Sequence, residues 1–401
     1  MTSEWNHFAL GEITELVIDY RGKTPKKLGG DWCKQGYRAL SAKNIKTGRI
    51  VQAETIRYID ESLYRKWMKD EVQRGDILIT SEAPFGQIFF WDSDEKIVLS
   101  QRLFCVRIKP EYDARFIYYY MTTPEFQSEL DGRATGTTVI GLRQPELMKC
   151  IIRCPEIQEQ KVIATILSSI DAKIIANEKV NDNLEQQAHS YFQELFVDNA
   201  SPEWTTGTIS DLGTVVGGST PSKAKPEYYT ESGIAWITPK DLSINKSKFV
   251  SHGENDITEL GLKNSSAAIM PEGTVLFSSR APIGYIAIAA GEVTTNQGFK
   301  SVVPKPEIGT PFVYFFLKNT LPVIEGMASG STFKEVSGST MKNVPAVIPD
   351  AETLAKFSDF CAPIFAQQRI LEEQNQSLAT LRDNLLPKLM SGEIDVSTVQ
   401  L

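Results

Sequence analysis

Four short polar segments of this chain carry side chains that could bind a nucleic acid, and each segment occurs twice. The pairs are Arg21–Lys27 with Gly217–Lys223, Ser41–Asn44 with Thr238–Asp241, Ser100–Arg102 with Thr295–Gln297, and Arg133–Thr138 with Met327–Thr332. Glycine lets a backbone approach a phosphate, to which Ser, Thr and Lys donate hydrogen bonds. Gln and Asn can read adenine through two hydrogen bonds, and Arg can read guanine. A Gly/Ser/Thr loop is more often a plain turn, and a duplicated turn would recur as well, so both interpretations stay open.

The candidate DNA contacts are the polar residues of these segments. In the first copy they are Arg21, Lys23, Thr24, Lys43, Asn44, Gln101, Arg102, Arg133, Thr135 and Thr137; in the second copy they are Ser219, Thr220, Lys223, Lys240, Asp241, Asn296, Gln297, Ser329, Ser331 and Thr332. The copies differ where Arg21-Gly22-Lys23 faces Gly218-Ser219 and where Gln101-Arg102 faces Gln297-Gly298. A shared framework with divergent loops would let the two copies read different short sequences.

Catalytic motifs are missing from the sequence. Its three histidines have no metal-ligand spacing, and it contains no GxGxxG dinucleotide-binding motif. Gly22-Lys23-Thr24 resembles the end of a P-loop, but Val17 stands where that loop requires glycine. Asp171-Ala172-Lys173 resembles part of some nuclease sites, and a solvated helix face is the preferred interpretation. We therefore expect a protein that is not an enzyme by itself and binds no metal.

The duplication extends over the whole chain. Glu4-Trp5 returns as Glu203-Trp204, and Ala83-Pro84-Phe85-Gly86 returns as Ala281-Pro282-Ile283-Gly284, with an offset that drifts from 199 to 194 residues. A repeat of this length has the size of a domain plus a helix. Two copies in one chain make a pseudo-dimer with an approximate twofold axis. Such a protein suits a target with two halves, of which duplex DNA is the commonest.

Composition and charge favour a cytoplasmic globular protein. No apolar run approaches the roughly 20 residues of a membrane helix, and the first residues lack a basic-then-apolar leader. Five scattered cysteines favour free thiols and complete no zinc site. The net charge of −8 is concentrated in residues 156–200 (−5) and 350–401 (−4), whereas 1–155 carries +2 and 201–349 carries −1. We expect globular domains at 1–155 and 201–349, each able to hold a local basic face, with helical spacers at 156–200 and 350–401.

Each globular segment is predicted to be an α+β unit. Short β-rich runs lie between Gly and Pro residues, at Asp76–Ser81, Gln87–Trp91 and Leu99–Ile108, with counterparts at Thr274–Ser279, Tyr285–Ala289 and Thr294–Val303. A short aromatic helix is expected to follow in each copy, at Arg115–Thr122 and Pro311–Lys318.

The helical segments show apolar residues in alternating steps of four and three, which predicts a heptad seam. Its members are Ile163, Leu167, Ile170, Ile174, Asn177, Asn181, Leu184, Ala188, Tyr191 and Leu195 in the first copy and Phe357, Cys361, Ile364, Gln368, Leu371, Asn375, Leu378, Arg382, Leu385 and Leu389 in the second. Asn181 and Asn375 are matched seam asparagines, whereas Gln368 and Arg382 interrupt the second seam. We favour two helices that pack on each other; two amphipathic helices, each packed on its own domain, are the alternative. Prolines at 155 and 349 mark the helix starts, and Gly392 marks a stop.

The whole chain resembles the specificity subunits of type I restriction-modification systems. The resemblance is carried by the Gly-x-Thr-Pro loops ending at Pro25 and Pro221, the two Ala-Pro-x-Gly turns, and Ala-x-Gly-x-Thr at 134–138 and 328–332. Pro155–Gln160 and the ending Leu385–Glu393 also match. The chain departs from the family pattern in having Arg21-Gly22-Lys23 in place of paired glycines, and Pro349-Asp-Ala-Glu-Thr in place of a Pro-x-x-x-Gln-Gln pattern.

The resemblance implies two target recognition domains, each of which binds one half of a bipartite asymmetric DNA site. Two long antiparallel helices would separate them and measure the spacer. Two methylation subunits would transfer methyl groups from S-adenosylmethionine to adenine N6, and restriction subunits would use ATP and Mg²⁺, so this chain would bind no cofactor. Off-seam apolar residues would either contact the methylation subunits or pack on the chain's own domains: Ile166, Ile175, Phe192, Phe360, Phe365, Leu381 and Leu386.

Three alternatives remain beside this interpretation. The partner could belong to a methylation-only system without a restriction subunit. The chain could be a scaffold that joins proteins without touching DNA. It could also be a methyltransferase or nuclease whose site the motifs do not reveal, and S-adenosylmethionine binding by the purified chain alone would favour that.

Overall fold

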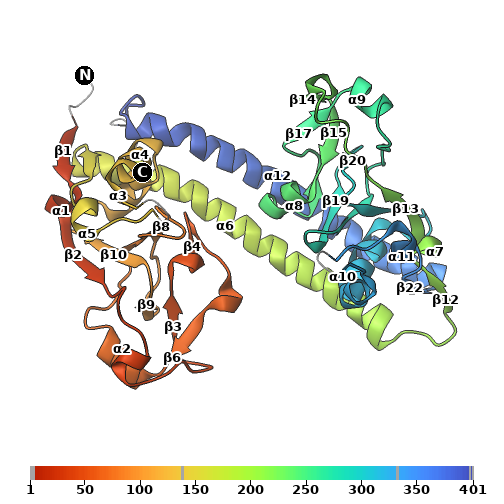
Figure 1. Ribbon diagram of the computed structural model, residues 1–401, viewed down its shortest axis with the longest axis horizontal. Coiled ribbons are helices and arrows are strands. Elements are labelled where there is room, and N and C mark those ends of the chain that lie inside the picture. Colours follow the sequence, from red (N-terminus) through yellow and green to blue (C-terminus); the bar gives the residue numbers. More distant parts are fainter. Residues whose placement is uncertain (1–4, 137–139, 331–333, 397–398, 400–401) are drawn as a thin grey trace. The chain divides into compact units, whose positions relative to one another are not determined.

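The computed structural model describes residues 5–136, 140–330, 334–396 and 399. Its contacts divide the chain into two units, residues 1–173 with 377–401 and residues 174–376. Each unit combines sheets with helices, which confirms the expected α+β class (Figure 1). Each unit also contains one part of each of two long helices, α6 (Ile157–Gln193) and α12 (Ala351–Met390). Within the described ranges, no helix is long and apolar enough to cross a membrane.

The first unit is built on a four-stranded antiparallel sheet with the order β2-β10-β7-β8. Smaller sheets have the orders β6-β3-β9, β1-β11 and β4-β5. Its elements are β1 Asn6–Ala9, α1 Leu10–Ile13, β2 Thr14–Asp19, η1 Lys26–Leu28, β3 Tyr37–Leu40, η2 Ala42–Asn44, β4 Ile45–Lys46, β5 Arg49–Ile50, η3 Ala53–Thr55, β6 Arg57–Ile59, α2 Glu61–Trp67, β7 Ile77–Thr80, β8 Ile88–Phe90, β9 Ile97–Leu99, β10 Leu103–Ile108, α3 Ala114–Met121, α4 Pro124–Arg133, α5 Gln144–Leu147 and β11 Ile151–Cys154.

The second unit repeats this plan. Its main sheet has the order β13-β21-β18-β19-β16, beside sheets of order β14-β17-β15-β20 and β12-β22. Its elements are η4 Glu194–Asp198, β12 Thr205–Thr208, α7 Ile209–Leu212, β13 Gly213–Gly217, η5 Pro226–Tyr228, β14 Tyr229–Thr230, β15 Ile234–Ile237, α8 Pro239–Ile244, β16 Phe249–Val250, β17 Asn255–Ile257, α9 Glu259–Lys263, β18 Val275–Ser279, β19 Ile283–Ala289, β20 Thr294–Thr295, β21 Lys300–Pro304, α10 Thr310–Met327, α11 Gly338–Lys342 and β22 Pro345–Ile348.

Each main sheet is buried on both faces because successive side chains of a strand point to opposite sides. In β7, Ile77 and Ile79 join a core with α3 and α6, whereas Leu78 joins a second core with the β6-β3-β9 sheet. In β18, Phe277 and Leu276 divide in the same way between two cores. A helical layer, α3 in the first unit and α10 in the second together with the long helices, therefore covers one face of each main sheet, and a smaller sheet covers the other.

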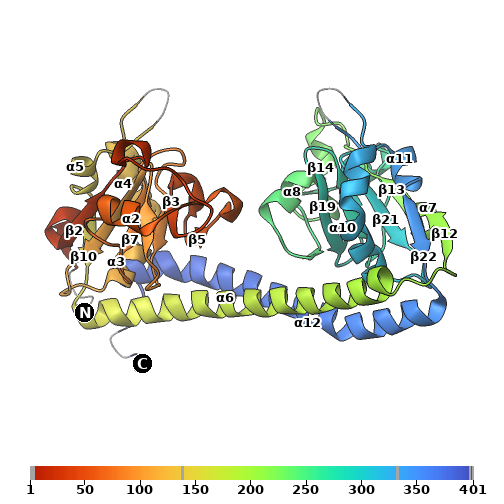
Figure 2. The same ribbon diagram turned by 90° about the horizontal axis from the view of Figure 1, so that it is seen from below.

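The two long helices run antiparallel within each unit (Figure 2). In the second unit Asn177 contacts Asn375 and Tyr191 contacts Phe360. Residue numbers on α12 therefore decrease as residue numbers on α6 increase, which is the antiparallel arrangement. Members of the predicted seam are buried or half-buried throughout. The starts after the prolines are confirmed, and α12 ends two residues before Gly392, whose φ is +75°.

Three predicted elements were wrong in extent. The runs Leu99–Ile108 and Thr294–Val303 are each two strands, β9 with β10 and β20 with β21, because the chain leaves one sheet and enters another between them. The predicted helix Pro311–Lys318 continues to Met327, since Ile324 packs into the core. The first copy breaks at this point instead, where Thr123 accepts a hydrogen bond from the Phe126 amide and starts α4.

Candidate nucleic-acid interface

Strand direction brings three of the four predicted loops of the first unit to one end of its sheets. β2 and β7 both run antiparallel to β10, so their C-terminal ends lie beside the start of β10. β3 and β9 are parallel, so they also end side by side. The loops that begin at Tyr20, Ser41 and Ser100 leave these strand ends. The sheet topology alone therefore places these loops next to one another.

Backbone hydrogen bonds then join the loops into one surface. The Ala42 amide donates to Gln101 O at 3.1 Å, and the Ser81 amide donates to Arg102 O at 2.9 Å. The Leu142 amide donates to Ser81 O at 3.0 Å, which attaches the end of the fourth segment. Arg21 Nη1 donates to Leu142 O at 3.3 Å and attaches the first segment.

The second unit uses equivalent hydrogen bonds. The Ser279 amide donates to Gly298 O at 2.7 Å, and the Val336 amide donates to Ser279 O at 3.0 Å. Because Leu40 pairs with Leu99 and Ile237 pairs with Thr295, Gln101 corresponds to Gln297 and Arg102 to Gly298. The match of Ser100–Arg102 with Thr295–Gln297 was therefore wrong by one residue, and Ser100 corresponds to Asn296. The other comparison from the sequence, of Gln101-Arg102 with Gln297-Gly298, has the observed register.

The candidate contacts differ in accessibility. Exposed are Lys43, Gln101, Arg102, Thr135, Lys223, Lys240, Gln297 and Ser329; half-buried are Arg21, Lys23, Thr24, Arg133, Ser219, Thr220 and Asn296; buried are Asn44 and Asp241. Thr137, Ser331 and Thr332 lie outside the described residues.

Asn44 and Asp241 have internal roles and are withdrawn from the candidate DNA contacts. The Asn44 side chain is 1% exposed, accepts from Ser41 and donates to Thr55 Oγ1 at 3.0 Å. Asp241 completes a capping box by accepting from the Thr238 amide at 2.7 Å. A buried polar group already bonded internally has no free donor or acceptor for a base, and a capping residue is the ordinary role of Asn or Asp there.

Arg21 and Lys23 are held in place by the protein. Arg21 forms a two-point ion pair with Asp19, each contact 2.8 Å, and its guanidinium lies 4.0 Å from the centre of the Phe104 ring. Lys23 Nζ donates to Trp67 O at 2.6 Å and lies over the Tyr20 ring. Burial, and then the nearby charge of Lys69, lowers the pKa of Lys23. Such prearranged cations could meet phosphate with little loss of side-chain entropy.

Arg102 and Gln101 project from the β9–β10 connection. Arg102 has φ +64° and forms an ion pair of 2.9 Å with Glu82, both side chains being well solvated. An exposed pair of this kind is weak, so Arg102 can exchange its acid for a base edge or a phosphate. The Gln101 side chain has no hydrogen-bond partner within the described chain. Arg133, in contrast, is paired with Glu129 at 2.9 Å.

The corresponding loop of the second unit is packed more tightly. A Cβ on Gly218 would lie 2.1 Å from Asn296 O and 2.4 Å from Thr295 O, whereas Gly22 has open space around it. Thr220 donates to Gln297 Oε1. Lys240 is paired with Glu254 at 2.6 Å.

Polar contacts occur inside the predicted helix seam. Asn177, a member of the first seam, donates through Nδ2 to Asn375 Oδ1 of the second seam at 2.8 Å. Gln368 does not interrupt the seam, because its amide donates to Asn181 O at 3.1 Å. Arg382 Nη1 likewise donates to Asp171 at 2.9 Å. Asp171 is therefore a helix-contact residue, and the interpretation of it as a solvated face was wrong.

A tyrosine attaches each unit's globular part to α6. Tyr119 donates to Asp171 at 2.6 Å, and Tyr314 donates to Glu185 at 3.1 Å. Burial and the neighbouring carboxylate raise the pKa of both tyrosines. Glu185 is half-buried, and Lys248 and Lys318 hold its pKa below the usual value against the opposing effect of desolvation. Sequence reasoning missed these partners, although the recurring aromatic runs at 116–120 and 312–316 pointed to the helices that carry them.

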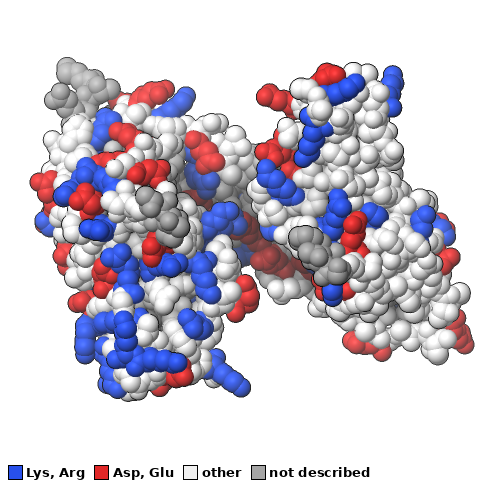
Figure 3. All heavy atoms as spheres, in the orientation of Figure 1, with Lys and Arg blue, Asp and Glu red and all other residues white. Residues whose placement is uncertain are grey.

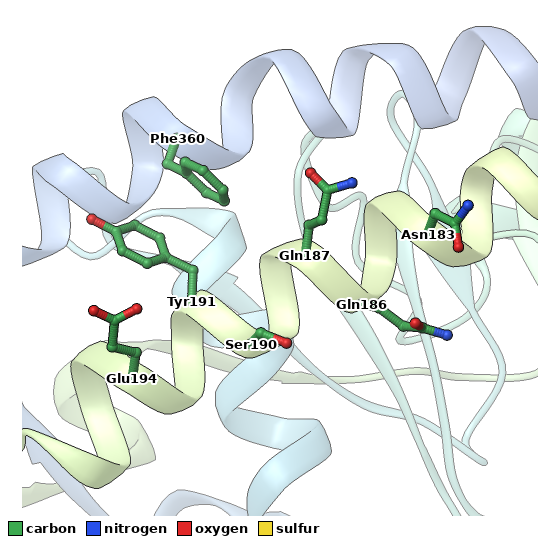
Figure 4. A pocket seen from close by; sticks show the side chains of 7 residues that line it. All are labelled: Asn183, Gln186, Gln187, Ser190, Tyr191, Glu194 and Phe360. Atoms are coloured by element: carbon green, nitrogen blue, oxygen red, sulfur yellow. The ribbon is translucent and has the colours of Figure 1, made fainter.

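The off-seam apolar residues divide between the two expected roles. Phe192 and Phe365 are core residues, and Ile166 and Leu386 pack against the first unit's core. The exposed ones are Ile175, Phe360 and Leu381. Phe360 and Tyr191 line an open hollow between α6 and α12, together with Asn183, Gln186, Gln187, Ser190 and Glu194 (Figure 4).

No three His, Cys, Asp or Glu side chains of the described chain converge as a metal site would require. The described cysteines are unpaired thiols, of which Cys33 is exposed and the other four are buried.

Comparison with known proteins agrees with this duplicated architecture. The family described as "Type I restriction modification DNA specificity domain" matches residues 2–186 and 202–381. The chain belongs to this family. The specificity subunit of type I restriction enzyme MjaIX from Methanocaldococcus jannaschii is 39% identical over 191 residues, which are 45% of this chain and 44% of that protein. The match thus spans less than half of that relative's length.

Other members of the specificity family match more of the chain at lower identity. The HindI specificity subunit of Haemophilus influenzae is 22% identical over 408 residues, covering 81% of this chain and 88% of that protein. The solved S subunit from M. genitalium has 17% identity and a TM-score of 0.59, with 96% of each chain covered. At this identity the likeness shows a shared fold. The two matched domains of the family each contain one set of the four loops.

Proposed function

We propose that this specificity subunit recognises a bipartite asymmetric DNA site and catalyses nothing itself. Each unit reads one half-site with the loops at the ends of its sheets. The observation that carries the proposal is that equivalent backbone hydrogen bonds, such as Ser81 to Arg102 and Ser279 to Gly298, join the loops in both copies. Exposed side chains on that common framework differ, because Arg102 stands where the second copy has Gly298. Different side chains at equivalent places would give an asymmetric target.

The long helices α6 and α12 serve, in this proposal, as a ruler for the unspecified spacer between half-sites. The segments that contain these helices have an excess of acidic residues, which the phosphate backbone of DNA repels. The exposed faces of the helices are therefore suited to contact protein partners and not DNA. Exposed Ile175, Phe360 and Leu381 are the proposed contacts for two methylation subunits, since solvent-facing apolar side chains favour burial against a partner. Those partners would carry S-adenosylmethionine and methylate adenine N6. Restriction subunits, which require ATP and Mg²⁺, would complete a nuclease in the cytoplasm.

The proposal is tested by co-expressing this chain with its methylation subunit in a methylation-free host and mapping adenine methylation across the genome. We expect one split motif, modified on both strands and lost when this chain is omitted. A stable complex that leaves the genome unmethylated and binds no DNA would contradict the proposal and favour a protein scaffold. Methylation without any restriction of unmodified phage DNA would identify a methylation-only system.

A further inference from the structure

The first unit has a strongly basic segment that its near-neutral total charge conceals. Residues 21–69 contain thirteen Lys and Arg against four Asp and Glu. The corresponding segment of the second unit, residues 218–266, contains six of each. The two copies of the repeat therefore differ by nine charges in the region that follows the first recognition loop.

Six of these cations make one exposed group, which we term the basic surface: Lys26, Lys27, Lys34, Arg57, Lys66 and Lys69. None of the six forms an ion pair with another described residue. Two of the four acids of the segment are engaged elsewhere, since Asp60 caps α2 and Glu61 pairs with Arg65, which is not one of the six. The positive charge is thus not neutralised locally.

The elements that carry the basic surface pack against one another. Gly30, two residues after the end of η1, lies against Leu63 of α2. The Cys33 amide donates to Tyr58 O at 2.9 Å, which attaches the next segment to β6. Arg57 of β6 lies 3.9 Å from the centre of the Trp32 ring. Figure 3 shows Lys and Arg gathered at the end of this unit where Figure 1 places α2 and β6.

The basic surface is continuous with the proposed recognition loops. Lys27 Nζ donates to Gly22 O at 2.9 Å, and Lys23 Nζ donates to Trp67 O at the end of α2. These two hydrogen bonds join the basic surface and the first proposed recognition loop into one continuous part of the first unit. In the second unit, Lys240 is paired with Glu254 and Lys248 is buried, so an equivalent surface is not formed by these two.

We infer that the basic surface binds the phosphates of duplex DNA that flanks the half-site read by the first unit. This inference rests on the proposed function and adds an asymmetry to it. The first unit supplies most of the sequence-independent, salt-sensitive part of DNA affinity, and the second unit relies more on its loops.

The test uses the complex of the full chain with its methylation subunits and a duplex containing the mapped site. Dissociation constants are measured by fluorescence anisotropy across a range of KCl concentrations. In the variant K26Q/K27Q/K66Q/K69Q, the slope of log Kd against log salt should fall by about 0.9 for each lost phosphate contact, or by about 3 to 4. The matched variant K223Q/K225Q/K240Q/K263Q in the second unit should change the slope by less than about 1.

A charge-preserving variant, K26R/K27R/K66R/K69R, should keep the wild-type slope and so separates charge from folding. The inference is overturned if the glutamine variant keeps the wild-type slope in a complex that still binds the site. It is also overturned if that variant loses only its methylation subunits on gel filtration, because the surface would then face protein. A wild-type complex that binds no DNA would instead remove the proposed function, and this inference with it.

Discussion

The asparagine pair inside the helix seam gives a prediction that can be worked through in free energy. Asn177 is 2% exposed, and its Nδ2 donates to Asn375 Oδ1 at 2.8 Å and to Gln374 at 3.3 Å. Asn375 is half-buried and also donates weakly to Ile174 O at 3.4 Å. A polar seam residue of this kind fixes the register of two helices at a cost in stability.

The two single substitutions are expected to have unequal effects. Asn375→Leu leaves the buried Asn177 amide with only its longer contact, so the cost is that of an unsatisfied buried group, about 1 to 3 kcal/mol. Asn177→Leu leaves Asn375 able to reach water, so it should cost about one ordinary hydrogen bond, roughly 0.5 to 1.5 kcal/mol. The double Leu variant replaces both partners by apolar groups and should be as stable as the wild type or more stable.

The assay is urea unfolding of the four proteins of the double-mutant cycle, followed by helix circular dichroism. A coupling energy of about 1 kcal/mol or more is expected for residues in contact. Asn183→Leu, on an exposed face of α6, is the matched control and should change stability by under about 0.5 kcal/mol. Additive single effects, or a double variant that is the least stable of the four, would refute the reasoning.

Four further outcomes are expected, three from burial or close approach and one from the length of α6. In the native chain Cys33 should be the thiol that reacts rapidly with a thiol reagent at pH 8, because it is exposed. The other four cysteines should react only after denaturation, because burial shields them and raises their pKa. Rapid reaction of all five thiols in the native chain would contradict this. Gly218→Ala should lower the melting temperature and weaken binding to the DNA site, because a methyl group at Gly218 would clash with Asn296 O. Gly22→Ala, at the matching position of the motif, should be near neutral, because Gly22 has open space around it. Equal effects of the two substitutions would contradict this assignment. Leu389→Ala should cost about 2 to 4 kcal/mol in urea unfolding, because this residue of α12 is 1% exposed in the first unit's core. Four residues inserted into the middle of α6 add about one turn, and methylation mapping should then show a spacer longer by about one or two base pairs; an unchanged spacer would end the ruler proposal.

The repeat, the long helices and the helix ends could be predicted from the sequence because they depend on local or periodic signals. Heptad spacing marks the seam over many turns, and Pro155, Pro349 and Gly392 act on the backbone next to them. The grouping of loops was also foreseeable in outline, since matched segments in a duplicated fold fall at matched places. The division of the chain into four parts at residues 155, 200 and 349 remains a prediction. The two compact units of the structure divide the chain differently, within α6 and within α12.

The finer assignments failed where a partner distant in the sequence decides the role. Asn44 looks like a base-reading amide, but Thr55 and the nearby backbone use its hydrogen-bonding groups. Asn181 and Asn177 are both on the seam side of α6, and only the facing helix selects Asn177 as the partner of Asn375. The one-residue error in the third loop arose because strand pairing, and not similarity of residues, sets the register there. Averaging charge over residues 1–155 likewise hid the basic segment.

Backbone hydrogen bonds explain how one framework can carry two different recognition surfaces. The bonds from Ser81 to Arg102 and from Ser279 to Gly298 use only amide and carbonyl groups, which every residue type other than proline supplies. Substitution of a side chain on the loop therefore leaves the attachment of the loop intact. Arg102 and Gly298 accept these bonds at equivalent places, although Arg102 has φ +64° and a Cβ on Gly298 would lie only 2.9 Å from Pro239 Cγ, so the backbone around the shared bond differs between the copies. The duplicated fold can thus change what each half reads without changing how its loops are held.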